Sequence, residues 1–576
     1  NKLLLYFMRF FYLCSFIIIF LTACSDDIPI PTPKLNSLEK LERHSENFAK
    51  GIYSYDNGIH VAIGYGIANS ILIEGNTGNI IIDTTDDVAQ AAEVLKEFQK
   101  INNNPIEAII YTHNHGDHVF GASAFYHAQE EAPLVIAHAT TAAKVNTILG
   151  KLQPIISLRS SRMFGTNLPP EDVINVGLGP FLAAGDNAPG YIAPNLTFEK
   201  ELKLNIAGIQ LELFHAPGET DDQIFVWLPE FNALMPGDNF YETFPNLYTL
   251  RGTSHRDVKG WIRSIDHMRS LQPTRLFPSH TMPVEGEEVM EALTVYRDGM
   301  QFIHDQTLRL MNKGFTADEI IESIQLPEEL AESPYLVEFY GTVRYSIRSI
   351  FNGYLGWFSG NPADLDPLTI SQKAEKISVL AGGDEALFNE LQNAYNNKEM
   401  QWVLELADLL LAREFNVSQV QDIKFDAIAY LGIRESNPPR RNYLLSMAHE
   451  FESGRPFTSL TERSPDILSQ MPLETFLEIL TIRMNPEKFL GKKLKVCLGF
   501  DSGKQFNLYL RNSILEVNTI DSDQSSCDIA MESSEQTFKE VLAGIRNPIV
   551  SIAAGEIVVS EGSNVEFLSF LADFRD

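Results

Sequence analysis

Three histidines and an aspartate fall within one seven-residue segment of this chain. Residues 112–118 read Thr-His-Asn-His-Gly-Asp-His, so that His113, His115, Asp117 and His118 share a single loop. Neutral imidazole and carboxylate are ligand types that Zn²⁺ takes at about 2.0 to 2.2 Å. The whole chain has 13 histidines, and a structural role rarely gathers three of them beside an aspartate. The segment therefore predicts a metal site.

The residues around this segment predict how it is held. Residues 106–111 form an apolar run rich in β-branched and aromatic side chains, which is typical of a buried strand. Residues 119–129 have spacing suited to a helix. The segment then lies at a strand-to-helix turn, where α/β folds usually place their chemistry. In such a loop the first two histidines can face one metal while Asp117 and His118 reach a second, about 3.5 to 4 Å away.

The H-x-H-x-D-H pattern resembles the signature of the metallo-β-lactamase superfamily, and the resemblance implies further ligands in a fixed order. Glu219 lies in a Pro-Gly-Glu-Thr turn where a histidine is common. Asp238 ends a Met-Pro-Gly-Asp run, and His280 follows Arg-Leu-Phe-Pro-Ser. Upstream, Asp83 resembles the strand-end aspartate of the fold, which supports a ligand rather than binding metal.

A glutamate at position 219 narrows the resemblance to the alkylsulfatase branch of that superfamily. Other segments resemble the same branch in the same order, and the similarity spans roughly residues 40 to 576. They are Arg-Met-Phe-Gly at 162–165, Tyr-Ile-Ala-Pro at 191–194, Asn-Leu-Tyr-Thr-Leu-Arg-Gly at 246–252, Arg-Asp at 256–257, Tyr-Gly-Thr at 340–342 and Tyr-Leu-Gly-Trp-Phe at 354–358.

Two positions depart from the family pattern. The family usually bridges its metals with glutamate, whereas Asp238 is one methylene shorter. After Tyr-Gly-Thr the family tends to have His-Asn, but this chain has Tyr345 and Ser346. The second change removes an imidazole that could assist a leaving group or bind the sulfate.

The resemblance implies two zinc ions as the cofactor. A water molecule shared by two cations loses a proton near neutral pH and becomes the nucleophile. Because a carboxylate replaces one histidine, manganese and iron stay open as the metal. The implied ligands are His113, His115 and Glu219 for one ion, Asp117, His118 and His280 for the other, and Asp238 as the bridge.

Three residues are candidates for contacting a substrate. Arg251 would pair with sulfate oxygens through its planar guanidinium, which lysine cannot imitate, and we assign it a catalytic role together with Asp238. Asn246 and Tyr191 are candidate hydrogen-bond donors. The alternative for Arg251 is a structural ion pair, with Asp257 as a candidate partner.

These features predict a metal-dependent alkylsulfatase that converts long-chain primary alkyl sulfates to an alcohol and inorganic sulfate. The expected substrate is a small amphipathic sulfate ester; the choice between sulfur–oxygen and carbon–oxygen cleavage stays open. One alternative is a hydrolase of the same fold acting on another ester or a β-lactam. Another is a non-catalytic lipid-binding protein that uses its C-terminal part alone.

The composition of the chain argues against some classes of binding partner. The net charge of −31 argues against nucleic acid, because neutralising phosphates requires clustered lysine and arginine. A small sulfate ester needs only a local cationic pocket. A chain of 576 residues is long enough for about three domains.

The N-terminal residues indicate export. Residues 3–23 are almost wholly apolar and lead into Leu-Thr-Ala-Cys, with Ser-Asp-Asp directly after Cys24. This resembles a bacterial lipoprotein signal, in which Cys24 is lipidated and anchors the protein to a membrane of the cell envelope. A plain transmembrane anchor is the alternative. The Pro-rich residues 28–33 would form a stiff tether.

The expected fold class is α/β: a metallo-β-lactamase-type αββα sandwich, then an all-α helical domain, then an α+β domain that resembles a sterol-carrier protein. In the alkylsulfatase family the helical segment is a dimerisation domain, so we expect a homodimer, with a helical cap that has no partner as the alternative.

Apolar residues of the last domain could line a groove for an alkyl chain or form its core. Cys497 and Cys527 are either a disulfide or two buried thiols. The expected divisions are a signal peptide at 1–24, a tether at 25–45, the catalytic domain at 46–300, the helical domain at 301–445 and the C-terminal domain at 465–576.

Overall fold

The computed structural model describes residues 35–182, 189–454, 471–519 and 526–574. The expected lipoprotein signal, Cys24 and most of the tether lie outside these ranges. Among the helices in the ranges that the structure describes, none combines the length and apolar character needed to cross a membrane.

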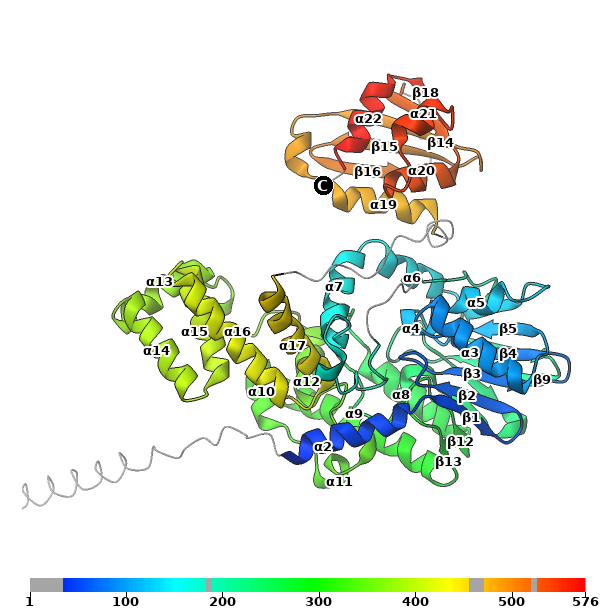
Figure 1. Cartoon of the computed structure of the whole chain (residues 1–576), viewed down its shortest axis with the longest axis horizontal. Helices are drawn as coiled ribbons and strands as arrows, with labels where there is room; N and C mark the ends of the chain where they lie inside the picture. The colour runs from blue at the N-terminus through cyan, green and yellow to red at the C-terminus, as the bar shows by residue number, and fades with distance from the viewer. Residues whose placement is uncertain (1–34, 183–188, 455–470, 520–525, 575–576) are drawn as a thin grey trace, which may run out of the picture.

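Two sheets form the first half of the chain (Figure 1). The first has seven strands in sequence order; its first four are antiparallel neighbours, and β4 to β7 run parallel. Its strands are β1 (Gly51–Tyr55), β2 (Ile59–Ile63), β3 (Ser70–Glu74), β4 (Asn79–Ile82), β5 (Ile106–Ile110), β6 (Leu134–His138) and β7 (Leu196–Phe198).

The second sheet has six strands in the order β13-β12-β11-β10-β9-β8. All pairs are antiparallel except β11 with β12. The strands are β8 (Glu201–Ile206), β9 (Ile209–His215), β10 (Ile224–Leu228), β11 (Ala233–Met235), β12 (Arg275–Leu276) and β13 (Val284–Glu285).

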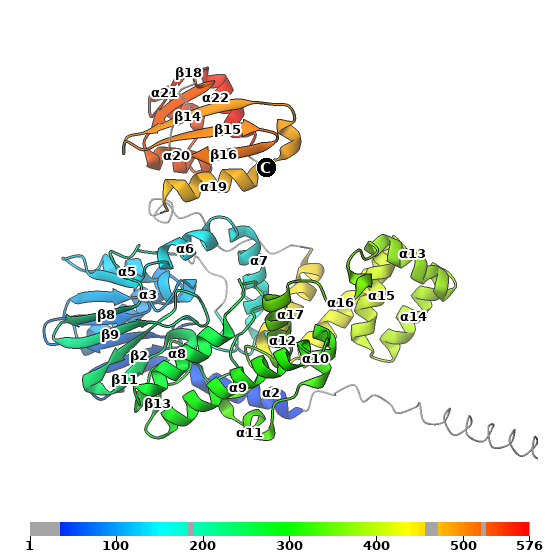
Figure 2. The ribbon, with the colours of Figure 1, turned by 180° about the vertical axis from the view of Figure 1, so that it is seen from behind.

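The sheets face each other, with helices on both outer sides, which confirms the expected αββα sandwich. Alternation of side chains explains the continuous apolar strands: Ile80 and Ile82 of β4 enter the core between the sheets, while Ile81 packs under the outer helices. In β10, Val226 likewise faces the other sheet and Phe225 faces outward. Figures 1 and 2 show the helices of the two sides. They are α3 (Val88–Ile101) and α5 (Ala122–Tyr126) on the first sheet, and α8 (Val258–Ser270) and α9 (Glu288–Met311) on the second.

The helix predicted over 119–129 is two short ones, α4 (Gly116–Val119) and α5. They separate at Gly121, whose backbone approaches the end of β4 so closely that a Cβ atom there would lie 1.8 Å from the carbonyl oxygen of Thr84. The Gly121 N–H donates to the carbonyl of Thr85. Spacing alone could not reveal this close approach.

No domain boundary separates the helical region from the sandwich. The division expected at residue 300 falls inside α9, and one hydrophobic core contains both Trp261 of α8 and Ile347 of α12 (Val343–Leu355). The expected end at residue 445 likewise falls inside α17 (Pro438–Ser453). A separate small core joins α13 (Ile370–Ala381), α14 (Asp384–Asn396), α15 (Met400–Ala412) and α16 (Val417–Arg434). The other helices of the region are α10 (Ala317–Ser323) and α11 (Glu328–Ala331).

The last part of the chain is an α+β layer with its own core. Its sheet has the order β16-β15-β14-β17-β18. Many of its apolar residues form this core. A cavity of about 10 Å³ lies against it, lined by residues that include Leu480, Val541 and Leu571. The elements are α19 (Leu473–Arg483), β14 (Leu494–Phe500), β15 (Gln505–Arg511), β16 (Ile514–Asn518), β17 (Ile529–Ser533), α20 (Glu535–Leu542), α21 (Pro548–Ala553), β18 (Ile557–Glu561) and α22 (Asn564–Ala572).

Cys497 and Cys527 form a disulfide, which decides between the two alternatives left open by the sequence. Their Cα atoms lie 5.9 Å apart, inside the range that a disulfide requires. The bond joins β14 to the residues just before β17 and encloses the β15–β16 hairpin. It ties together two neighbouring strands of the sheet that are distant in sequence.

We expect reduction of this disulfide to destabilise the C-terminal domain by about 3 to 4 kcal/mol, because its sequence separation of 30 residues restricts the unfolded chain. Calorimetry with and without a reductant, on the native protein and on a Cys497→Ser/Cys527→Ser variant, measures this. The variant should be insensitive to the reductant. An unchanged thermal transition in the native protein on reduction would contradict the prediction.

Candidate metal centre

The residues expected to bind metal all follow the carboxyl ends of strands. Strands β4 and β5 are parallel, as are β11 and β12, and β9 runs in the same direction as β11 because both are antiparallel to β10. Their loops therefore meet at one edge of the sandwich. They carry Asp83 after β4, residues 112–118 after β5, Glu219 after β9, Asp238 after β11 and His280 after β12.

All seven expected ligands gather there, and each is at least partly buried. Their ligand atoms form three overlapping groups, each with atoms within 4.8 Å of one another. The groups are His113, His118 and Asp238; Asp117, His118 and His280; and His115, Glu219 and Asp238.

Asp238 lies at the centre of this arrangement. Its Oδ2 is 3.2 Å from Nε2 of His280 and 3.7 Å from Nε2 of His113, and its Oδ1 is 3.4 Å from Nε2 of His118. Asp117 faces His118 and His280 at 3.5 and 3.6 Å. A shorter carboxylate than the family's glutamate thus reaches histidines from two different loops.

The outward nitrogens of three histidines are held by other groups, so that Nε2 points inward. Nδ1 of His118 donates to Asp83 at 2.8 Å, and Nδ1 of His280 donates to the carbonyl of Ile67 at 3.0 Å. Nδ1 of His113 donates to the Thr112 hydroxyl at 3.1 Å. Fixing the tautomer in this way is how proteins orient metal-binding imidazoles.

Two inward atoms show that the site fits a cation. Nε2 of His118 and Oδ1 of Asp238 are fully buried and have no hydrogen-bond partner among the described residues. Buried polar atoms rarely stay unsatisfied, and imidazole nitrogen with carboxylate oxygen is the donor set of a divalent metal ion. His113 and His115 add two ring nitrogens that face each other at 2.8 Å.

Asp83 connects three of the loops that form the site. Besides His118, it accepts hydrogen bonds from the N–H and hydroxyl of Thr112 and from the hydroxyl of Ser279. Its backbone has φ of 57°, a left-handed conformation that aspartate tolerates better than most residues. The structure therefore places Asp83 behind the ligands, as a support.

Glu219 is held by residues to which the sequence assigned no role. Its Oε1 lies 2.9 Å from a guanidinium nitrogen of Arg256, and its Oε2 accepts from the hydroxyl of Tyr241 at 3.0 Å. Both members of the ion pair are 2% exposed. Arg256 also donates to the carbonyl of Asn246. The Arg-Asp motif at 256–257 marked this position, but only the fold brings it to Glu219.

Burial and neighbouring charge set the protonation of the ligands. Burial lowers the pKa of His113 to about 4, with His118 adding to the shift, so its imidazole is neutral and its lone pair is free for metal. Burial acts to raise the pKa of Asp117, but His118 and His280 outweigh it and bring that pKa to about 2. Burial raises the pKa of Glu219, and Arg256 opposes this shift.

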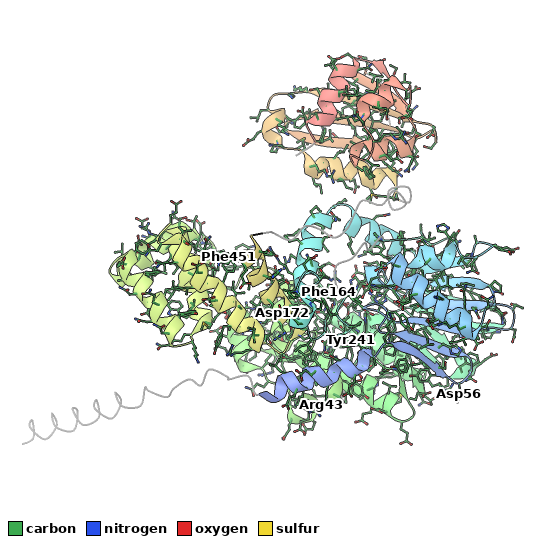
Figure 3. The ribbon with its side chains drawn as sticks, viewed as in Figure 1. Arg43, Asp56, Phe164, Asp172, Tyr241 and Phe451 are labelled. Carbon is green, nitrogen blue, oxygen red and sulfur yellow. A yellow bond between two sulfur atoms is a disulfide. The ribbon has the colours of Figure 1, made fainter. Side chains whose placement is uncertain are left out.

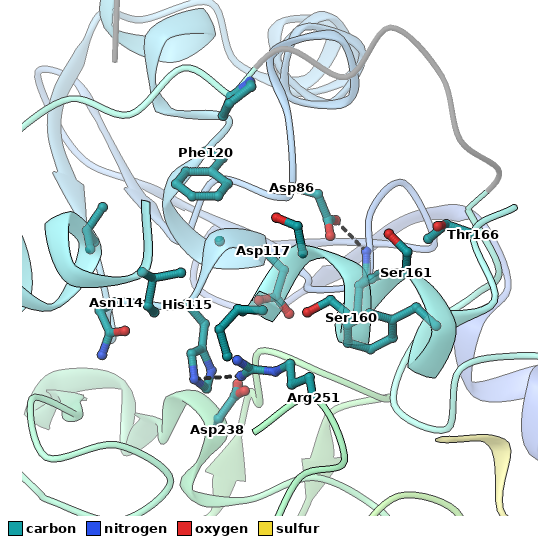
Figure 4. A pocket seen from close by; sticks show the side chains of 18 of the residues that line it. Asp86, Asn114, His115, Asp117, Phe120, Ser160, Ser161, Thr166, Asp238 and Arg251 are labelled. Carbon is teal, nitrogen blue, oxygen red and sulfur yellow. Dashed lines mark hydrogen bonds between the residues drawn. The ribbon is translucent and has the colours of Figure 1, made fainter. Parts of the chain in front are cut away.

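A cavity of about 260 Å³ opens onto the cluster (Figure 4). Its polar end contains Asp117, Glu219, Asp238 and Arg251. Nη2 of Arg251 donates to Nε2 of His115 at 2.8 Å, whereas Asp257, its candidate partner, pairs with Arg263. Apolar and polar side chains share the rest of the lining. The apolar ones are Ile67, Phe120, Val145, Ile148, Ile156, Phe164 and Leu178, and the polar ones include Gln153, Ser157, Ser160, Ser161 and Thr166.

Another cavity-lining carboxyl group was not singled out in the sequence. Asp86 accepts from the N–H of Ile67 at 2.7 Å, and burial, together with the charge of Asp117, raises its pKa to about 7. The sequence did offer one signal for Asp86, since it lies only three residues after Asp83, the aspartate at the end of the strand.

Several expected or suspected contacts do not line the cavity. Tyr191 packs beside Tyr111 in the apolar layer under the outer helices, and Asn246 is buried, with its carbonyl bound by Arg256. Tyr345 lies near the start of α12 and also stays outside the lining, as does Ser346. Tyr340 is the tyrosine of this region that lines it.

We expect Arg256→Met to lower the free energy of unfolding of the metal-free protein by about 3 to 5 kcal/mol, because it leaves the Glu219 carboxylate buried without a partner. Urea denaturation after chelation measures this, and Arg256→Lys, which keeps the charge, is the control. Adding Glu219→Gln to Arg256→Met should recover part of the loss. Equal stability of the Met and Lys variants would refute the role of the pair.

Comparison with known proteins covers almost the whole chain. Models of three families match: metallo-beta-lactamase superfamily at residues 63–280, alkyl sulfatase dimerisation at 316–454 and alkyl sulfatase C-terminal at 461–576. The second of these matches ends in α17, near residue 454.

Similar proteins share this organisation. A linear primary-alkylsulfatase from a Pseudomonas species is 35% identical over 528 residues, which cover 88% of this chain and 98% of that protein. The alkyl/aryl-sulfatase BDS1 of Saccharomyces cerevisiae is 29% identical, covering 92% of this chain and 83% of that protein. The solved structure of Pisa1, a stereoselective inverting sec-alkylsulfatase from a Pseudomonas species, is 25% identical and has a TM-score of 0.85, with 93% of this chain and 86% of that chain covered. With the sandwich and its cluster of histidines and carboxylates, these matches show that the chain belongs to the alkylsulfatase family of the metallo-β-lactamase superfamily.

Proposed function

We propose that this protein is a metal-dependent alkylsulfatase that hydrolyses long-chain primary alkyl sulfates to an alcohol and inorganic sulfate. The observation that carries the proposal is the lining of one cavity, which brings a metal-ligand cluster and a guanidinium together with a group of apolar side chains. An alkyl sulfate likewise combines an anionic head with an apolar tail. The relative that is 35% identical is named a linear primary-alkylsulfatase, which supports the primary ester as substrate.

Two zinc ions fit the donor set. His113, His115 and Glu219 would hold one, Asp117, His118 and His280 the other, with Asp238 between them. When bound, such ions lower the pKa of water to supply a nucleophile near neutral pH and offset the charge of the sulfate group. The protein's own part is to lower the pKa of His113 by burial, to hold Asp117 ionised beside His118 and His280, and to fix the ring orientation of His118 through Asp83.

Arg251 is the residue that binds the sulfate group in this proposal. Its planar guanidinium matches two oxygens of a tetrahedral anion, and it already reaches the edge of the cluster at His115. The alkyl tail would lie along Val145, Ile148 and Ile156, where burial contributes about 0.8 kcal/mol per methylene. The two contacts together position the ester bond over the cluster.

We also propose a homodimer formed through the region from the end of α12 to α13. Between residues 354 and 380 the chain exposes eight large apolar side chains. The match to an alkyl sulfatase dimerisation model covers the same residues and points to a second copy as the partner. The exposed residues are Tyr354, Leu355, Trp357, Leu365, Leu368, Ile370, Val379 and Leu380.

Export and lipidation at Cys24 remain part of the proposal. The Cys497–Cys527 disulfide supports it, because disulfides persist in oxidising compartments and are rare in the cytosol.

The direct test is sulfate release from dodecyl sulfate by protein lacking residues 1–24. We expect chelation to abolish release and zinc to restore it. Glu219→Ala and Arg251→Ala should each reduce kcat/KM by at least about a hundredfold, since each removes a group at the reacting centre. Arg263→Ala, an exposed arginine outside the cavity, is the control and should behave like the unmodified protein.

Dodecyl phosphate and dodecyl acetate, which keep the same tail, test the head-group assignment. Faster hydrolysis of either than of dodecyl sulfate by the metal-loaded protein would overturn the sulfatase proposal and favour a different ester. No sulfate release from protein that carries a full complement of metal would do the same.

For the dimer, we expect Trp357→Asp/Leu380→Asp to halve the molar mass measured by light scattering, because buried charge would oppose association. Leu490→Asp, which changes a leucine that is also exposed but lies in the C-terminal domain, should leave the mass unchanged. A mass that is equal in all three proteins would exclude this surface as the interface.

A further inference from the structure

Arg251 projects from a long segment without helix or strand. Regular structure stops after the short 3-10 turn at Gly237–Asn239 and resumes at α8, and Arg251 lies late in the intervening loop. The conformation of such a loop depends on bonds from outside it. The contact of Arg251 with His115 cannot provide this anchor if the guanidinium is to turn to a substrate.

A second arginine anchors the loop one residue earlier. Arg159 lies on α7 (Gln153–Phe164), and its Nε and Nη2 both donate to the carbonyl oxygen of Leu250, at 3.0 and 2.7 Å. The carbonyl of Leu250 and the N–H and Cα of Arg251 belong to one planar peptide group. Fixing that oxygen therefore restrains the peptide plane and, with it, the positions of the N and Cα atoms from which the Arg251 side chain extends.

Helix α7 is itself held to α17 one turn beyond Arg159. Nε and Nη2 of Arg162 donate to the two carboxylate oxygens of Glu450 on α17, each at 2.7 Å. The hydroxyl of Ser446, also on α17, donates to the carbonyl of Arg162 at 3.2 Å. A two-point ion pair of this kind restrains rotation and sliding of the helix.

The same helix lines the apolar part of the cavity with Ile156 and Phe164. Figure 3 shows Phe164 on α7, between the sandwich and the helices that include α17. One rigid element thus contacts both the wall for the alkyl tail and the loop for the sulfate group. The distance between the two binding contacts is set by α7.

We propose that Arg159 is a positioning residue that holds Arg251 in its sulfate-binding orientation through the peptide group of Leu250. This rests on the proposed function, because it takes Arg251 as the sulfate ligand. Arg159 does not line the cavity and touches no group of the reaction itself. In this proposal its effect on sulfate binding passes through Arg251.

A double-mutant cycle tests this dependence. We expect Arg159→Gln to raise KM for dodecyl sulfate and the inhibition constant of inorganic sulfate by about tenfold to a hundredfold, since small misplacement of a binding group has effects of this size. In an Arg251→Ala background the same change should alter either constant by less than about twofold, because the residue it positions is absent. Arg159→Lys, which offers a single point of contact, should fall between.

Three measurements separate positioning from simple loss of structure. Bound metal and melting temperature should match those of Lys144→Gln, a control that breaks an exposed ion pair on the neighbouring helix α6 (Thr141–Leu149). Calorimetric binding of inorganic sulfate reports on Arg159 without turnover.

The outcomes are distinguishable. A large effect of Arg251→Ala with an Arg159→Gln effect that is absent, or equally large in both backgrounds, would overturn the positioning role alone. Unchanged kinetics in Arg251→Ala would overturn both this role and the assigned sulfate ligand. Absence of sulfate release in every protein, with sulfate binding still weakened by Arg159→Gln only when Arg251 is present, would overturn the proposed function and support the positioning role.

Discussion

The structure depends on one arrangement: four imidazoles and three carboxylates crowded at the carboxyl ends of strands from two facing sheets. Burying so many ionisable groups is unfavourable unless each has a partner, since the cost is several kcal/mol for each unpaired charge. The surrounding loops supply these partners. Asp83, after β4, binds Thr112 and His118 after β5 and Ser279 after β12, so the second sheet is joined to the first at the site itself.

The need for a partner to each buried charge also explains the ion pair of Glu219 and Arg256. A glutamate in place of the superfamily's histidine brings an additional negative charge into the cluster, and Arg256 offsets it from a loop that also carries Arg251. Tyr241, between the sandwich and the helical region in Figure 3, satisfies the second oxygen of Glu219 and accepts from the N–H of Asn246. The ligand set and the substrate-binding loop are therefore parts of one hydrogen-bonded unit.

The helical region is structurally continuous with the catalytic sandwich. Helix α9 packs on the second sheet and on α12, and α7 is fixed to α17 through Arg162 and Glu450. A structural change in the helical region can therefore be transmitted to the cavity wall. The C-terminal domain has its own core and contacts the turn between α6 and α7, where Ile479 lies beside Gly150 and Glu478 pairs with Lys151. Many of its apolar residues stabilise that core.

The sequence by itself determined the fold class, most strand and helix positions and the identity of the seven residues that gather as candidate ligands. Local spacing sufficed for the strands and for the four clustered residues at 112–118, because these patterns lie in consecutive residues. The fold class and the ligands Glu219, Asp238 and His280 followed from the resemblance to the family. Only the tertiary structure decided the pairing of Cys497 with Cys527, the partner of Glu219 and the place of Tyr345 outside the cavity. Each of these depends on which distant segments meet, and Arg159 and Leu250, 91 residues apart, show no common pattern in the sequence.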